Sequence, residues 1–224
     1  MKILALETST EFCSVALWHD GEIDGIEQHV GQGHSERLLT MVEELLRRHD
    51  VGVKNLDGIA YGEGPGSFTG LRIACGVTQG LAFAGGIPVV GVGTLMAMAE
   101  CAQAERVICC MDARMHEIYH AAYERKASGW HAARAPGVYA PRAAPLVAGG
   151  GWLGCGNAFS VYGEMLSQRY EGQLTGVAAA IHPRAHEVAR LAAPRFEHGE
   201  GRDAAAVAPL YVRDKVALKM HEQR

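Results

Sequence analysis

The chain has 224 residues, 48% of them hydrophobic and 21% charged, which is the balance of an ordinary globular protein. A formal charge of -4 and a pI near 6.3 predict no basic surface of the kind that grips a nucleic-acid backbone. The opening MKILALETST is too short in apolar residues for a signal peptide, and no apolar run is long enough to cross a membrane. We therefore expect a cytoplasmic protein, not bound to membranes, whose six cysteines remain thiols.

The first hundred residues predict a mixed α/β unit. Two apolar runs and a third run over 22–29, entered through the turn signal DG, are typical of an antiparallel meander. Ser35 is a candidate N-cap for the helix that follows. The later elements are a strand in LDGIAYGEGPG, a helix in SFTGLRIACGVTQGLAFAGG that ends at paired glycines, a strand in PVVGVG and a helix in TLMAMAECAQA. Residues 1–104 are predicted to form an N-terminal lobe.

A second lobe is predicted over residues 105–224. RVICCM favours a strand, DAR a polar turn and MHEIYHAAYE further extended chain. The last predicted helix, HPRAHEVARLAAPRF, has Pro183 in its first turn, and it is a candidate to pack back on the N-terminal lobe. PLYVRDKVALKM closes the chain.

The sequence HEIYH, residues 116–120, matches the zinc motif of metallopeptidases. That motif needs a helix, which brings both histidines to one metal. Ile118 and Tyr119 favour a strand, in which four residues span about 13 Å, whereas two ligands of one zinc lie within about 4 Å. We therefore predict two histidines on one face of a strand and no metal site. For His182 and His186, at the same spacing, a surface helix is expected.

The stretch YGEGPGSFTGLR, residues 61–72, predicts a glycine-rich turn between a strand and a helix. Such a turn aims unpaired N–H groups and the positive end of the helix dipole at whatever lies above it, so an anion is one candidate occupant. No Gly-Lys-Ser/Thr follows, which excludes a Walker A loop. The alternative interpretation, a tight turn that only packs, stays open.

The helix after this turn carries small residues at four-residue spacing: Gly70, Ala74 and Gly76, Gly80, Ala84. An interior glycine costs about 0.8–1.0 kcal/mol relative to alanine. Close approach of another helix would offset that cost. The neighbour is either another part of this chain or a partner that binds beside Arg72, Gln79 and Phe83.

The polar turn ETST, residues 7–10, joins the first two strands. In the ATPase domains of sugar kinases, Hsp70 and actin, a turn of this kind contacts the phosphates of a nucleotide. The candidate nucleotide or phosphate contacts are Glu7, Thr8, Ser9 and Thr10 together with Gly64, Gly66 and Ser67 of the glycine-rich turn. An ordinary polar β turn is the alternative.

Five stretches in this order, LALETSTEFCSVAL, GEGPGSFTGLRIACGVTQGLAF, DARMHEIYHAAY, GCGNAF and PLYVRDKVA, resemble the TsaB (YeaZ) family over nearly the whole chain. The resemblance implies an α/β, two-lobed, actin/Hsp70/sugar-kinase-like (ribonuclease H-like) fold with mixed sheets flanked by helices. It also implies a non-catalytic scaffold and activator within the complex that transfers a threonylcarbamoyl group to N6 of adenosine 37, in tRNAs that read codons beginning with A.

The same resemblance implies the partners. They are a catalytic relative, TsaD, and an ATPase, TsaE, with tRNA bound only through the complex and a homodimer formed when the chain is alone. ATP or ADP and a metal ion belong to the complex, and this chain is expected to bind no cofactor tightly. The first two long helices are implied as the partner contact, and the expected residues on them are Ser35, Leu38, Leu39, Val42, Leu45, Phe68, Arg72, Gly76, Gln79, Gly80 and Phe83.

One departure from the catalytic relative bears on activity. That relative carries its metal histidines after a strand, whereas the matching region here, VVGVGTLMAMAE, has none near Gly93, Thr94 and Met98. We therefore expect no catalytic or metal-binding residues in this chain. An independent actin-like nucleotide hydrolase or kinase, or a metallopeptidase, remains the alternative.

Overall fold

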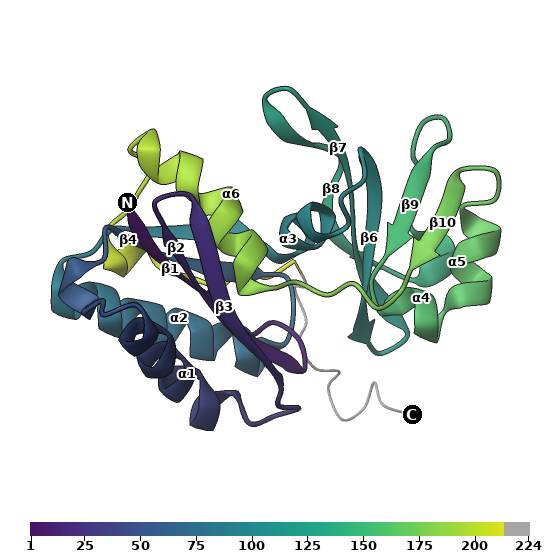
Figure 1. Ribbon diagram of the computed structural model, residues 1–224. Helices are drawn as coiled ribbons and strands as arrows, with labels where there is room; N and C mark the ends of the chain where they lie inside the picture. The colour runs from purple at the N-terminus through teal and green to yellow at the C-terminus, as the bar shows by residue number, and fades with distance from the viewer. Residues whose placement is uncertain (213–224) are drawn as a thin grey trace.

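The computed structural model describes residues 1–212, which form two lobes, each built on a five-stranded sheet (Figure 1). Residues 213–224, part of the predicted second lobe, lie outside the described residues. The first sheet has the order β3-β2-β1-β4-β5 and consists of β1 (Lys2–Glu7), β2 (Phe12–His19), β3 (Glu22–His29), β4 (Gly58–Gly64) and β5 (Val89–Gly93). The second has the order β10-β9-β6-β7-β8 and consists of β6 (Arg106–Arg114), β7 (Glu117–Lys126), β8 (Gly129–Tyr139), β9 (Trp152–Cys155) and β10 (Leu174–Ala178).

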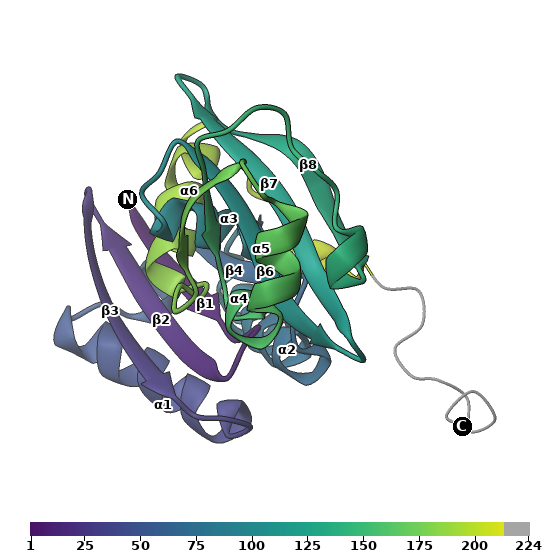
Figure 2. The ribbon, with the colours of Figure 1, turned by 90° about the vertical axis from the view of Figure 1, so that its right-hand side faces the viewer.

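Six α-helices cover these sheets in the described part of the chain. They are α1 (His34–Arg48), α2 (Phe68–Gly85), α3 (Thr94–Cys101), α4 (Ala158–Val161), α5 (Gly163–Arg169) and α6 (Ala185–Glu197). In Figure 1, α1 and α2 lie under the first sheet and α6 lies above it, while α3 stands between the lobes. In Figure 2, α4 and α5 lie in front of the second sheet, on its outer face. Both sheets are therefore covered on two sides, which explains their many buried positions.

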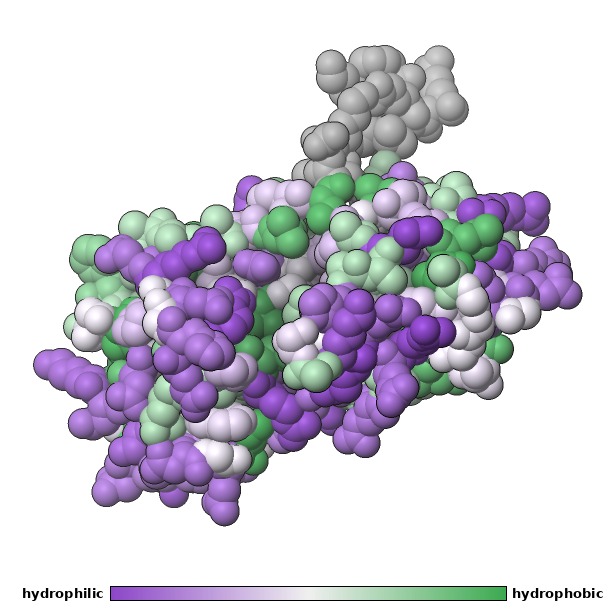
Figure 3. Space-filling view, turned by 90° about the horizontal axis from the view of Figure 1, so that it is seen from above, coloured by the Kyte–Doolittle hydropathy of each residue, from purple (hydrophilic) through white to green (hydrophobic). Residues whose placement is uncertain are grey.

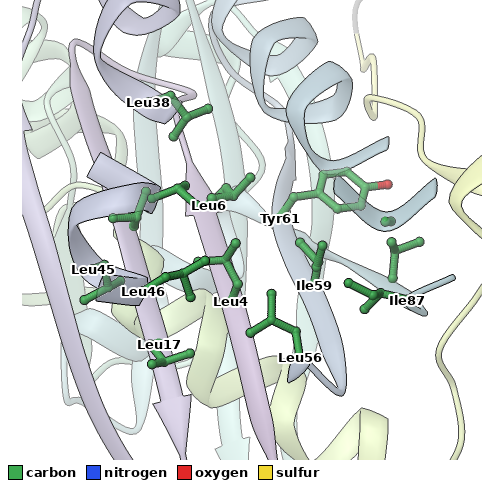
Figure 4. Close-up of a cluster of buried hydrophobic side chains, with 14 of the residues drawn as sticks. Leu4, Leu6, Leu17, Leu38, Leu45, Leu46, Leu56, Ile59, Tyr61 and Ile87 are labelled. Carbon is green, nitrogen blue, oxygen red and sulfur yellow. The ribbon is translucent and has the colours of Figure 1, made fainter. Parts of the chain in front are cut away.

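The central strand of the first lobe shows how the sequence pattern sets these layers. Successive side chains of a strand point to opposite faces. Leu4 and Leu6 of β1 join the core under α1 and α2, whereas Ile3 and Ala5 pack toward α6. Alternate residues of KILALE therefore enter two different cores, and Figure 4 shows Leu4 and Leu6 in the same cluster as Leu38 and Leu45.

The face toward α6 is lined by small side chains. Ala5, Ala16 and Ala60 of the sheet pack with Ala185, Ala189, Ala192 and Ala193 of the helix, all of them buried. Ser14 Oγ accepts a 2.9 Å hydrogen bond from the Ala185 N–H, which anchors the first turn of α6. Although α6 follows the second lobe in the chain, it packs on the first sheet. His186 lies on this helix with its side chain 37% exposed, in line with the expected surface helix, whereas His182 precedes the helix.

Three local predictions also need correction. α1 begins after Gly33, so Ser35 lies inside the first turn and makes no capping hydrogen bond. α6 begins after Arg184, so Pro183 precedes the helix. DAR is the end of β6, because Asp112 continues to pair with Ile118 of β7, and the turn follows at Met115 and His116. In each case the predicted element exists, but its boundary differs by a few residues.

Candidate partner interface and interlobe cleft

The two histidines of HEIYH lie in different environments. His116 is exposed in the turn before β7, with φ at 58°, while His120 is completely buried within the strand. Neither ring nitrogen of His120 has a hydrogen-bond partner among the described residues. The predicted strand is confirmed, but the prediction that both histidines share one of its faces is wrong. Residues 1–212 hold no group of three His, Cys, Asp or Glu side chains placed to bind a metal, so the zinc interpretation has no geometric support.

A cleft of about 630 Å³ lies between the lobes. Its first-lobe wall includes Ser9, Thr10, Gly66 and Ser67, and its second-lobe wall includes Asp112, Arg114 and Asn157. The glycine-rich turn contacts the ETST turn directly, since the Ser67 N–H donates to the Ser9 carbonyl at 2.8 Å. The structure thus brings together the two turns that the sequence singled out.

Glu7 and Thr8 lie beneath that cleft and hold the two turns together. Glu7 is 1% exposed, one of its carboxylate oxygens accepts from the Ser9 N–H at 2.5 Å, and the other has no partner. Burial raises the pKa of Glu7. The Thr8 hydroxyl donates to the Gly70 carbonyl at 2.8 Å. Neither residue lines the cleft, so both serve the packing of the turns.

The glycines of the loop are explained by these contacts. A Cβ at Gly66 would lie 2.5 Å from Cβ of Ser9, and one at Gly70 would lie 1.9 Å from the Thr8 carbonyl oxygen. Gly64 has φ at 115°, a conformation that disfavours side chains, and its N–H donates to Thr94 Oγ1. Two of these glycines therefore allow the turns to approach closely, which supports the packing interpretation of the motif.

We tested whether the cleft fits the nucleotide that an actin-like fold implies. Ser9, Thr10 and Ser67 line it as hydroxyl residues, and α2 begins there. However, Glu7, the acidic residue of the turn, packs inside the protein against Gly62. A Cβ at Gly62 would lie 1.8 Å from Glu7 Oε2. The Asp112 carboxylate is also occupied, since it pairs with Arg114 and accepts from Tyr162. Glu11 also lines the cleft, but its side chain is exposed, so among the described residues no buried, unoccupied carboxylate faces the cleft.

The region matched to the metal histidines of the catalytic relative is part of the core. Thr94 is completely buried and accepts the hydrogen bond from Gly64, and Met98 packs with Leu95 between α3 and the second sheet. Met98 therefore contributes to the contact between the lobes, whereas Thr94 supports the glycine-rich turn.

The predicted interface residues of α1 divide into two groups. Leu38, Val42 and Leu45 are at most 2% exposed and point into the first core, as Figure 4 shows for Leu38 and Leu45. A partner cannot reach them in the folded chain, so assigning them to the interface is wrong. Leu39 is 48% exposed, and Ser35 is exposed as well.

On α2 the predicted residues form an accessible strip. Gly76 and Gly80 are exposed, and a Cβ added at either would meet no atom of the described residues within 4 Å. Phe83 is 82% exposed, more than any other large hydrophobic side chain within residues 1–212. We call Gly76, Gly80 and Phe83 the α2 strip. By contrast, the side of the first lobe over α6 carries mostly hydrophilic residues (Figure 3).

The remaining α2 candidates have contacts within the chain. The Arg72 guanidinium lies 3.6 Å above the Phe68 ring and donates to the Tyr211 hydroxyl at 3.0 Å, and Gln79 donates to the Val207 carbonyl. The sequence pattern did not predict Tyr211 as a neighbour of this face. Its only signal was the apolar PLY before the end of the chain, which does not indicate a contact 139 residues away.

Comparison with known proteins places this arrangement in a family. The family model TsaD, tRNA N6-adenosine threonylcarbamoyltransferase, matches residues 27–219. The tRNA threonylcarbamoyladenosine biosynthesis protein TsaB of Escherichia coli is 35% identical over 229 residues, covering 98% of this chain and 97% of that protein. The chain belongs to the TsaB family. The TsaB protein of Haemophilus influenzae is 34% identical, with 98% and 96% covered.

A solved structure in this family has the same fold. YeaZ from Pseudomonas aeruginosa is 38% identical, with a TM-score of 0.85 over 94% of this chain and 99% of that one. The predicted membership of the TsaB (YeaZ) family and the predicted two-lobed actin-like fold are therefore confirmed. Within residues 1–212, no helix has both the length and the apolar character needed to cross a bilayer.

Proposed function

We propose that this TsaB-family chain is a non-catalytic subunit of the complex that adds the threonylcarbamoyl group to N6 of adenosine 37 in tRNAs reading codons that begin with A. The relatives that match over the full chain are named as tRNA threonylcarbamoyladenosine biosynthesis proteins, and the matching family model is named for the transferase. In this proposal the transferase relative TsaD carries the chemistry and the ATPase TsaE joins them. The nucleotide and metal belong to the complex.

The α2 strip is the observation that carries the proposal. Two open glycines on one helix face let another helix approach closely, and Phe83 provides an aromatic side chain that a partner would bury. Each glycine costs about 0.8–1.0 kcal/mol in the isolated helix. A contact made with another chain offsets that cost, which supports a scaffold that binds its partner through α2. The exposed Leu39 of the neighbouring helix α1 is proposed as a further contact.

The charge of the chain supports an indirect role in binding tRNA. The net charge of -4 provides little attraction for phosphates, so in this proposal the positive surface comes from the other subunits. When the partner is absent, the same strip is free to pair with a second copy, which is the proposed origin of a homodimer.

The interface is tested by copurification with the catalytic relative. Gly80→Arg and Gly76→Arg each place a long charged side chain where the partner helix approaches, so each is expected to lower recovery of the complex at least tenfold. Gly163→Arg, at another open glycine on α5 of the second lobe, is the matched control and is expected to copurify normally. Normal copurification of both strip variants would contradict the interface.

The alternative is an independent nucleotide hydrolase that uses the interlobe cleft. Ser9, Thr10 and Ser67 line that cleft, which is the observation in its favour. The purified chain is incubated with ATP and Mg²⁺, and phosphate release is followed. We expect no turnover above a Ser9→Ala/Thr10→Ala variant. Turnover by the purified chain that this variant abolishes would overturn the non-catalytic role.

A further inference from the structure

A second groove, of about 550 Å³, follows the outer edge of β5 and is separate from the interlobe cleft described above. Its first-lobe walls are the β5 backbone, α6 with Leu191 and Arg195, and the segment 206–210. Across the groove lie Tyr123, Ala132 and Pro136 of the second lobe. A molecule bound here would contact both lobes. The volume of the groove is in the range of small-molecule binding sites.

An unpaired carboxylate lies at the floor of this groove. The Glu63 carboxylate covers Gly91, since a Cβ at Gly91 would lie 2.2 Å from Glu63 Oε2. The glycine therefore makes the room that this side chain occupies. Among the described residues, no hydrogen bond or ion pair satisfies the carboxylate, and burial raises the pKa of Glu63 while Arg195 and Arg202 oppose that shift.

The two nearby arginines play different parts. The Arg195 guanidinium already has partners within the protein, because it donates hydrogen bonds to the Glu200 carboxylate at 2.9 Å and to the Gly91 carbonyl at 2.6 Å. Arg202 is held at the edge of β5 by two backbone hydrogen bonds with Val89, and its side chain is exposed and makes no ion pair in the described chain. The groove thus holds one anchored but unpaired cation and one unpaired carboxylate.

The rest of the lining is largely apolar. Met96, Leu191 and Pro136 face the same space as Glu63 and Arg202. A ligand carrying only a phosphate would meet an uncompensated carboxylate, and one carrying only an ammonium would leave Arg202 unpaired. A zwitterion with a short apolar side chain satisfies both charges and covers the apolar wall.

We propose that this groove binds a small zwitterionic ligand of the free α-amino-acid class, with the ammonium on Glu63, the carboxylate on Arg202 and an aliphatic side chain against Met96 and Leu191. The proposal concerns the chain by itself and does not depend on the α2 strip or on tRNA modification. Ligand binding would join the lobes, so it is also expected to raise the thermal midpoint of unfolding.

The test uses the purified full chain and calorimetric titration with L-leucine. Saturable binding is expected, and two analogues serve as probes: L-leucinamide lacks the carboxylate, and N-acetyl-L-leucine lacks the ammonium. Each is expected to bind at least tenfold more weakly, because each lacks the charged group that makes a charge-assisted hydrogen bond with Glu63 or Arg202.

Variants locate the site. Glu63→Gln and Arg202→Gln are each expected to weaken L-leucine binding at least tenfold, and Arg202→Gln keeps the fold because its exposed side chain has no contact that the strand pairing needs. Glu197→Gln and Arg142→Gln, exposed charges outside the groove, are the matched controls. Absence of saturable binding, equal binding of the analogues, or unchanged affinity in Arg202→Gln would overturn the proposal.

Discussion

His120 is a neutral imidazole enclosed by aromatic rings. Its ring stacks at 6.2 Å from Tyr170 and meets the edge of Tyr139 at 5.8 Å, and neither nitrogen has a partner among the described residues. Burial, and to a lesser degree the charge of Arg134, lowers the pKa of His120 to about 4. The folded chain therefore resists protonation at a position that the unfolded chain protonates readily.

This difference predicts a loss of stability in mild acid. Between pH 6.5 and about 4 the unfolded state binds a proton that the folded state excludes, so the free energy of unfolding falls as pH falls. The full contribution is about 3 kcal/mol. In urea titrations at pH 7, 6, 5 and 4.5, His120→Gln is expected to lose correspondingly less stability than the wild type.

The exposed histidine of the same motif is the control. His116→Gln is expected to follow the wild-type pH dependence, because His116 lies in an exposed turn. If His120→Gln also follows the wild-type curve, His120 is not held neutral. The motif that matched a zinc site would then have neither a metal nor an acid-sensitive role.

At the scale of the helices, α1 and α2 use their exposed faces differently. The apolar stripe of α1 faces its own sheet. Leu39 is the one large hydrophobic side chain of α1 that is substantially exposed. α2 keeps the open glycines and Phe83 outside. The partner surface is therefore expected to be centred on α2.

Substitutions at neighbouring leucines separate core from interface. Leu38→Ala removes a side chain that is 1% exposed and is expected to lower the free energy of unfolding by about 2–5 kcal/mol. Leu39→Ala is expected to change it by less than about 0.5 kcal/mol and to weaken binding of the catalytic relative. Chemical denaturation and copurification check the pair, and equal destabilisation by both would contradict the assignment.

Glycines of α2 give a second matched pair. Gly76→Ala is expected to stabilise the chain by about 0.8–1.0 kcal/mol, because a Cβ there meets nothing within 4 Å in the described chain. Gly70→Ala is expected to destabilise it, because its Cβ would lie 1.9 Å from the Thr8 carbonyl oxygen. Thermal unfolding of the chain alone distinguishes them. The measurement is made at a concentration at which the chain is monomeric, and a destabilised Gly76→Ala there would mean that another part of the same chain covers α2.

These pairs also show what the sequence could and could not predict. Continuous apolar runs such as KILALE predicted strands, because a strand covered on both faces buries successive residues. Helical spacing predicted α1 and α2, because burial of one helix face imposes that period. The same spacing does not tell whether an apolar stripe meets its own sheet or another protein, so Leu38, Val42 and Leu45 were misassigned. The unpaired Glu63 could not be predicted, because it depends on Gly91 from another strand.

For the whole molecule, the surfaces proposed here lie on different sides. The α2 strip is on a helix that lies under the first sheet in Figure 1. The β5 groove is lined by both lobes, among them Leu191 of α6 and Pro136 of β8. Resemblance over the full chain predicted the fold and the family, since both depend on the entire pattern. It could not assign the groove, since that depends on side chains brought together by packing.

If one strip serves both associations, the homodimer and the heterodimer exclude each other. The chain alone is expected to shift from monomer to dimer with increasing concentration in light-scattering measurements, and an equimolar amount of the catalytic relative is expected to convert it to a one-to-one complex.

Phe83→Asp introduces a charge at the most exposed large hydrophobic side chain of the described residues and is expected to abolish both associations. Val161→Asp, at a 56% exposed apolar side chain on α4, is the control and is expected to abolish neither. A dimer that persists in Phe83→Asp after the heterodimer is lost would mean that two copies meet through another surface, and the open glycines would then serve the catalytic partner alone.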